Sequence, residues 1–162
     1  MTTTLHKDDI LHALQDVKDP EIPTVSVVDL GVITNVEVVD NSVRIVMTPT
    51  FVGCPAIEYM QNDVKNRIQQ MGVDDVTVEV DMTTPWSTNN VTEQGLEGLR
   101  KHGLALPQRF EGEFEPEILL NASCPFCQST HTTLQSMFGP TLCRAIYYCN
   151  TCKQAFEQFK PV

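Results

Sequence analysis

Apolar residues recur at helical spacing in two places within the first 103 residues, and a third, shorter helix is expected after them. The longest run places an apolar side chain every three or four positions over residues 57–71, and it is followed by Gly72, a residue type that commonly ends a helix. A shorter run over residues 10–17 stops before Pro20, which cannot continue a helix. A third helix is expected over residues 92–102. The pattern therefore predicts three helices.

Strand-like alternation of apolar and polar residues lies between these helices. Residues 36–38 and 43–47 alternate on either side of a turn at residues 40–41, which predicts a β-hairpin. Residues 76–82 alternate strictly and predict a third strand. The predicted order is α-β-β-α-β-α. Residues 1–103 are therefore expected to form a small α+β domain with a three-stranded sheet and helices on one side.

The rest of the chain has a different character. Residues 104–116 contain two prolines and lack a regular period, which is typical of a linker. Residues 117–162 hold five of the six cysteines together with strand-like apolar residues. We expect a small cysteine-rich β module there, so that the chain has two domains, 1–103 and 117–162.

The composition and the charge of the chain exclude some classes of partner. The chain has 162 residues, of which 41% are hydrophobic and 20% charged, as in ordinary globular proteins. Its net charge of −10 gives no long-range attraction to nucleic-acid phosphates or to an anionic membrane surface, so neither is an expected partner. The sequence shows no apolar run of membrane-spanning length and no secretion signal. We expect a soluble cytoplasmic protein.

Four of the cysteines form two C-x-x-C pairs. Cys124 and Cys127 make the first pair, Cys149 and Cys152 make the second, and residues 128–148 separate them. A C-x-x-C pair offers two thiolates to one ion from a tight turn, and two pairs complete a tetrahedral site with four thiolates. The spacing predicts a zinc ribbon, a β module held by a structural zinc ion.

Two alternatives remain open in this module. The same spacing could hold iron, as in rubredoxin-like electron carriers, but those proteins have glycines where this chain has Gln128 and Lys153. Cys143 is a surplus thiol. It is either a small side chain buried in a strand or an additional sulfur for metal binding or transfer.

Cys54 is the single cysteine of the predicted first domain. It follows Thr48, Thr50 and Gly53, where the chain passes from the hairpin to the long helix. Pro55 suits the first position of that helix, which would make Cys54 the N-cap. The helix dipole stabilises a thiolate there, so that Cys54 could act as a nucleophile or as a soft-metal ligand. Ordinary packing into the core is an equal alternative.

A rigid acidic loop is the other unusual segment. Asp19 and Glu21 lie on a loop that Pro20 and Pro23 hold extended. The loop is either a solvated connection or a wall beside the Cys54 segment. The sequence contains none of the glycine-rich nucleotide-binding or serine-hydrolase motifs, and we assign no catalytic residue.

Several motifs together carry a family resemblance. Residues 19–23 (DPEIP), 29–31 (DLG) and 48–55 (TPTFVGCP) resemble the iron–sulfur cluster assembly family that includes the SufT-like proteins and the eukaryotic cytosolic targeting factor. The two cysteine pairs, with residues 138–143 (FGPTLC) between them, resemble the tail of the PaaD family, also called PaaJ. That family belongs to the phenylacetyl-CoA epoxidase system, a ring-epoxidising oxygenase of aerobic phenylacetate degradation.

The resemblance implies an accessory protein and not the oxygenating enzyme. It implies a role in maturing the iron–sulfur or metal centres of the oxygenase, with oxygenase subunits and iron–sulfur assembly proteins as partners. Cys54 would be a thiol that holds iron or a cluster transiently, and Cys143 matches a further cysteine of the PaaD tail. The chain departs from such tails at Pro161 and Val162, where a cysteine often stands. A structural subunit of the oxygenase is an alternative, and a homodimer stays open.

Overall fold

A computed structural model of the chain describes residues 4–109, 111–113 and 115–161. The chain divides into two compact units, residues 1–86 and 87–162. The sequence analysis placed residues 87–103 in the first domain, whereas the structure groups them with the second unit. We still predict that residues 1–103 and 117–162 fold as separate domains.

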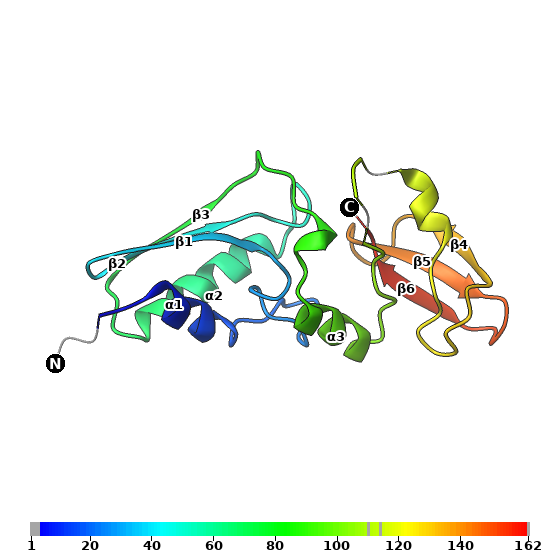
Figure 1. Ribbon diagram of the computed structural model, residues 1–162, viewed down its shortest axis with the longest axis horizontal. Helices are drawn as coiled ribbons and strands as arrows, with labels where there is room; N and C mark the ends of the chain where they lie inside the picture. The colour runs from blue at the N-terminus through cyan, green and yellow to red at the C-terminus, as the bar shows by residue number, and fades with distance from the viewer. Residues whose placement is uncertain (1–3, 110, 114, 162) are drawn as a thin grey trace. The chain divides into compact units, whose positions relative to one another are not determined.

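The first unit is a three-stranded sheet covered by helices. Its elements are α1 (Lys7–Leu14), β1 (Ile33–Val39), β2 (Ser42–Met47), α2 (Ile57–Gln69) and β3 (Asp75–Val80). The sheet order is β1-β2-β3, with β1 and β2 antiparallel and β2 and β3 parallel. Helix α2 is the crossover that a parallel pair requires, and α1 and α2 lie on the same face of the sheet (Figure 1). The predicted three-stranded α+β domain is confirmed.

The core of this unit lies between α2 and the sheet. Met60, Val64 and Ile68 on α2 are at most 2% exposed, as are Ile45 and Met47 on β2. These residues come from the helical spacing and the strand alternation that the sequence shows. Burial of these two apolar faces against each other therefore fixes the layers of the unit.

The ends of the elements follow from local interactions. Gly72 has φ of 87° and ends the turn after α2, as predicted. Strand β3 ends at Val80, before the predicted end at Met82. The reason is a tight turn, in which the Asp81 carboxylate accepts backbone N–H groups from Thr83 and Thr84 at 2.8 and 3.2 Å.

The second unit is built around an antiparallel three-stranded sheet in the order β4-β5-β6. Its elements are η1 (Thr88–Asn90), α3 (Glu93–Lys101), η2 (Pro116–Leu120), β4 (Thr132–Ser136), β5 (Arg144–Cys149) and β6 (Ala155–Phe159). Figure 1 shows the three strands in yellow-orange to red. The predicted ribbon-like β module is confirmed. None of the helices in the described parts of the chain is long and apolar enough to cross a membrane.

Part of the segment predicted as a linker is attached to this sheet. Ala105 pairs with Gln158 of β6 in a parallel bridge. The Ala105 N–H donates to the Glu157 carbonyl at 2.9 Å, and the Ala105 carbonyl accepts from the Phe159 N–H at 3.3 Å. The backbone of residues 104–106 is therefore part of the second unit in the structure.

Candidate functional site

The two cysteine pairs lie on two turns of the same construction. In the first turn, the Cys124 N–H donates to the Ser129 carbonyl, and the Gln128 N–H donates to the Cys124 carbonyl, both at 2.9 Å. Residues 149–154 repeat both hydrogen bonds, at 2.9 and 3.0 Å. Each turn therefore presents its two thiols from the same backbone shape.

Gln128 and Lys153 follow the second cysteine of each pair, and both adopt a left-handed backbone with φ of 63°. In the second turn, the Cys152 N–H points to the Cys149 sulfur at 3.5 Å. The sequence analysis took the missing glycines as an argument against iron. The structure removes that argument, because two non-glycine residues adopt the conformation for which glycine is the usual choice.

The four sulfur atoms of Cys124, Cys127, Cys149 and Cys152 all lie within 4.8 Å of one another. Two of the sulfur–sulfur distances are 3.7 Å (Cys124 to Cys152) and 3.6 Å (Cys127 to Cys149). A tetrahedral zinc ion with Zn–S bonds of about 2.3 Å requires sulfur–sulfur edges of about 3.8 Å. The donor set and its spacing therefore fit one tetrahedral metal ion.

The surroundings of the four thiols differ. Cys124 and Cys149 are fully buried, whereas Cys152 is half-buried and Cys127 is exposed. The hydrogen bond from the Cys152 N–H lowers the pKa of Cys149 to about 6, while burial raises the pKa of Cys152 to about 12. Four thiolates this close repel one another, and a bound cation would allow all four thiols to ionise.

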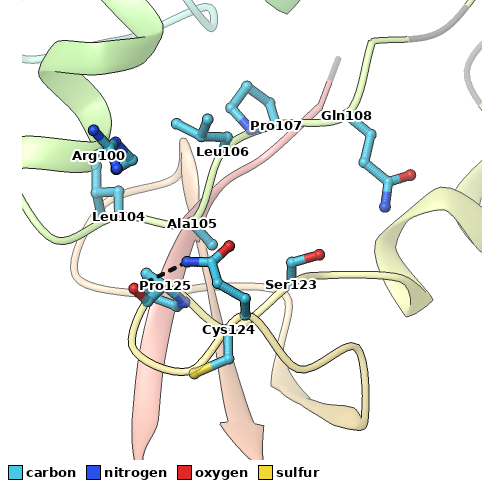
Figure 2. A pocket seen from close by; sticks show the side chains of 10 residues that line it. Arg100, Leu104, Ala105, Leu106, Pro107, Gln108, Ser123, Cys124 and Pro125 are labelled. Carbon is cyan, nitrogen blue, oxygen red and sulfur yellow. Dashed lines mark hydrogen bonds between the residues drawn. The ribbon is translucent and has the colours of Figure 1, made fainter.

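A cavity of about 310 Å³ lies beside the first cysteine turn. Leu106, Pro107 and Pro125 supply part of its wall, and Arg100 lies at one side. Figure 2 shows that the Cys124 side chain points its sulfur away from Leu106 and Pro107. The Cys124 sulfur therefore points away from this part of the cavity wall.

Cys54 lies between β2 and α2, but it is not the N-cap of the helix. Helix α2 begins at Ile57 with Ala56 as N-cap, so the predicted capping role of Cys54 and the first-turn position of Pro55 are wrong. The Cys54 carbonyl accepts the Ile57 N–H, whereas the first helical bond runs from Met60 to Ala56. An extra turn therefore separates the thiol from the helix. Cys54 is 7% exposed.

The residues before Cys54 hold the loop to the sheet. The Thr48 N–H donates to the Val32 carbonyl at 2.8 Å, and the Thr48 hydroxyl lies 3.1 Å from that of Thr34. Thr34 donates its hydroxyl proton to the Val46 carbonyl, so that Thr48 is the donor to Thr34. Thr48 is 1% exposed and anchors the loop, whereas Thr50 is half-buried.

The Asp19 carboxylate organises its own loop. Its Oδ1 accepts the N–H groups of Glu21 and Ile22 at 2.7 and 3.1 Å, and the Asp19 side chain is buried. Glu21 is half-buried. These bonds give Asp19 a structural role in the turn that contains Pro20. The proposed role of Asp19 and Glu21 as a wall beside Cys54 stays a prediction.

The sheet brings a second loop to the edge that carries Cys54. Strands β2 and β3 are parallel and end together, with Met47 opposite Val80. The loop from Thr48 to Cys54 and the turn at residues 81–84 therefore leave the same edge, joined by a 2.8 Å bond from the Asp81 N–H to the Met47 carbonyl. Hydrogen bonds from Thr83 and Thr84 hold the pKa of the Asp81 carboxyl well below its usual range. The sequence analysis missed this turn, although aspartate followed by two threonines within three residues is a signal for it.

Cys143 lies apart from the four sulfurs. It is half-buried, precedes β5, and its sulfur lies 3.0 Å from the Thr141 hydroxyl. In the described part of the chain, the group of potential metal ligands contains the other four ribbon cysteines and not Cys143. The four-thiolate site is complete without it.

Comparisons with known proteins match both parts of the chain. Residues 7–80 match the family described as iron–sulfur cluster assembly protein, and residues 116–160 match the PaaD zinc beta ribbon domain. A protein of Escherichia coli, named as one of the subunits of a "Putative 1,2-phenylacetyl-CoA epoxidase", is 36% identical over 149 residues, which cover 91% of this chain and 88% of that protein. An "Fe-S protein maturation auxiliary factor" of Porphyromonas gingivalis is 36% identical, over 56% of this chain and 87% of that protein.

Solved structures match part of the chain. A domain of unknown function, DUF59, from Bacillus anthracis has a TM-score of 0.54 and 29% identity, and covers 57% of this chain and 90% of its own. A conserved hypothetical protein of Thermotoga maritima has a TM-score of 0.53 and 30% identity, over 64% of this chain and 100% of its own. These likenesses support the α+β fold assigned above.

Proposed function

The chain belongs to the PaaD family, and we propose that it is an accessory protein that matures the iron–sulfur or metal centres of a ring-epoxidising oxygenase for phenylacetyl-CoA. One observation carries the proposal: a single chain joins a domain of the iron–sulfur cluster assembly family to a ribbon with a four-thiolate site. The Escherichia coli relative is named as an epoxidase subunit, and two other relatives are named as maturation factors. The chain itself does not carry out the oxygenation.

The proposed work of the assembly domain is exchange of a soft ligand at Cys54. Its thiolate would hold iron or a cluster as cargo, and the sulfur–iron bond would break as a donor atom of the client protein forms its own. No electron is transferred in this exchange, and the released thiolate takes up a proton. Because Cys54 is only 7% exposed, the loop must open before the thiol meets a partner. Gly53, with φ of 84°, provides a flexible position next to it.

The decisive experiment replaces Cys54 by serine. The oxygenase would be produced in cells that lack this protein and contain either the wild-type chain or the Cys54→Ser variant. We expect the variant to fold and keep its ribbon metal, while the iron and acid-labile sulfide of the oxygenase fall to the level found without the chain. Val39→Ser changes an exposed side chain at the opposite end of the sheet, where Val39 pairs with Ser42, and this variant should mature the oxygenase normally. Normal maturation with Cys54→Ser would contradict the mechanism.

We propose that the ribbon metal is zinc and that its role is structural. Four thiolates from two turns suit zinc, and the site leaves no coordination position for a substrate. The left-handed backbone at Gln128 and Lys153 leaves one competing function open, a rubredoxin-like electron carrier, because it provides the turn shape that glycines provide in those proteins. Metal analysis with an absorption spectrum on protein purified without oxygen separates the two. We expect one colourless zinc ion per chain, whereas a red ferric thiolate centre would establish the electron carrier.

Purification of the oxygenase complex tests the third alternative, in which this chain is a structural subunit of the oxygenase. An accessory protein acts transiently and should be absent from the finished oxygenase complex, whereas a structural subunit would co-purify in constant stoichiometry.

All six cysteines lie in the described parts of the chain, and none of them forms a disulfide. We infer that the protein acts in the cytoplasm, where thiols stay reduced.

A further inference from the structure

The loop between β4 and β5 exposes an unusual amount of apolar surface. Met137, Phe138 and Leu142 are 44%, 65% and 52% exposed. Residues 136–143 contain no charged side chain. Single exposed apolar residues are common, but three large ones within six positions form a patch that calls for an explanation. The function proposed above does not use this loop.

Hydrogen bonds hold the loop in one shape. The Ser136 hydroxyl donates to the Phe138 carbonyl and accepts the Phe138 N–H, at 2.9 and 3.1 Å. The Gly139 N–H donates to the Arg144 carbonyl at 2.8 Å. A Cβ at position 139 would lie 3.2 Å from that carbonyl oxygen, so the close approach favours glycine. The apolar side chains are therefore presented by an ordered loop, which lowers the entropy cost of binding a partner.

One cation borders the loop. The Lys160 ammonium donates to the Met137 carbonyl at 3.1 Å and lies 5.1 Å from the centre of the Phe138 ring. Among the described residues, no carboxylate forms an ion pair with Lys160. The ammonium therefore has donors left for a carboxylate from outside the chain.

The loop and the metal site lie at opposite ends of the ribbon. Thr132 pairs with Cys149 beside the cysteine turns, while Ser136 pairs with Ile146 next to the loop. Four residue steps along β4 separate these pairs by about 13 Å. A partner on the loop therefore does not need to touch the four thiolates.

We propose that residues 136–143, together with Lys160, form the docking surface for a client protein that offers an apolar pocket with a carboxylate at its rim. The inference rests on the proposed function, which makes the client a subunit of the oxygenase. Electrostatic repulsion argues against a second copy of this chain as the partner bound to this surface. A symmetric dimer through this surface would bring two Lys160 residues together in chains that each carry a net charge of −10.

Binding to the oxygenase subunits tests the proposal. The probe is the purified set of oxygenase subunits made in cells without this protein, and the dissociation constant is measured with the full chain. We expect the double variant Phe138→Ala/Leu142→Ala to bind at least tenfold more weakly, because buried apolar anchors dominate such interfaces. Lys160→Glu should also weaken binding and remove part of its salt dependence.

Phe126→Ala is the matched control. Phe126 is also an exposed aromatic residue of the ribbon, 54% exposed, but it lies in the first cysteine turn at the opposite end. The Phe126→Ala variant should bind the oxygenase subunits as tightly as the wild type does. Zinc content and thermal unfolding check that every variant is folded.

The outcomes separate this inference from the proposed function. If the wild type binds and matures the oxygenase and the loop variants do so equally well, the docking surface is wrong and the function stands. If the wild type binds no oxygenase subunit, the proposed function fails with it. A concentration-dependent dimer that Phe138→Ala/Leu142→Ala abolishes would identify a second copy as the occupant and overturn the proposal.

Discussion

At the scale of single residues, Gln128 and Lys153 adopt a left-handed backbone that their residue types do not predict. Both have φ of 63°, and neither is glycine or asparagine. An L-residue in this conformation costs about 1–2 kcal/mol. Closure of each cysteine turn requires the conformation, so the metal site and the turn hydrogen bonds must offset this cost.

Lys153→Gly should therefore stabilise the ribbon. Lys153 is exposed, so loss of its side chain removes little packing, and glycine adopts the left-handed backbone without the steric cost. We expect the metal-loaded variant to be about 1 kcal/mol more stable than Lys153→Ala, which removes the same charge but keeps the strain. Thermal unfolding of the two variants measures the difference. Equal stability would show that the turn carries no strain.

At the scale of elements, one side chain ties η2 to the ribbon sheet. Tyr147 on β5 is fully buried, stacks on Phe156 of β6 at 5.4 Å, and donates its hydroxyl to the Leu119 carbonyl at 2.7 Å. Burial raises the pKa of Tyr147 to about 12. The sequence shows an apolar strand here, but only the packed structure shows which carbonyl the hydroxyl meets.

Tyr147→Phe should destabilise the protein by about 1–3 kcal/mol below pH 10, because it leaves the buried Leu119 carbonyl without its donor. The advantage of the wild type should shrink as the pH rises from 10 towards 12. In that window the unfolded chain loses the phenol proton while the folded protein still holds it, so that rising pH favours unfolding. Denaturant unfolding at pH 9 and pH 11 measures this. A wild-type advantage that is the same at both values would show that the phenol is not held neutral by burial.

At the scale of the whole molecule, the two units differ in how they are stabilised. The first has a continuous apolar core between α2 and the sheet. Among the described residues, one buried cluster of the ribbon has seven members, of which Tyr147 and Phe156 are the large ones, and two of the members are the metal-site cysteines Cys124 and Cys149. Small domains with so little core commonly depend on a metal for folding.

Removal of the metal by a strong chelator should therefore unfold the ribbon and leave the first unit folded. A structural zinc ion contributes an apparent binding free energy of about 10–16 kcal/mol, which exceeds the stability of a small domain without it. Hydrogen exchange followed by mass spectrometry should show loss of protection in residues 116–161 with protection retained in residues 7–80. Loss of protection in both segments, or in neither, would contradict the separate roles assigned to metal and core.

Features that depend on neighbours along the chain could be predicted from the sequence. The helical spacing over residues 57–71 predicted α2 to within two residues, because burial of one helix face imposes that period. The alternation at residues 36–47 predicted the hairpin. The two C-x-x-C pairs predicted the four-sulfur site, because both thiols of a pair come from one turn.

Contacts between residues far apart in the sequence became visible in the folded structure and could not be predicted. The parallel pairing of β2 with β3 brings the Cys54 loop and the Asp81 turn to one edge, and the pairing of Ala105 with β6 joins a predicted linker to the ribbon. The contact of Lys160 with Phe138 is of the same kind. A local pattern cannot predict such contacts, because they are selected by the packing of whole elements and not by the residues next to them.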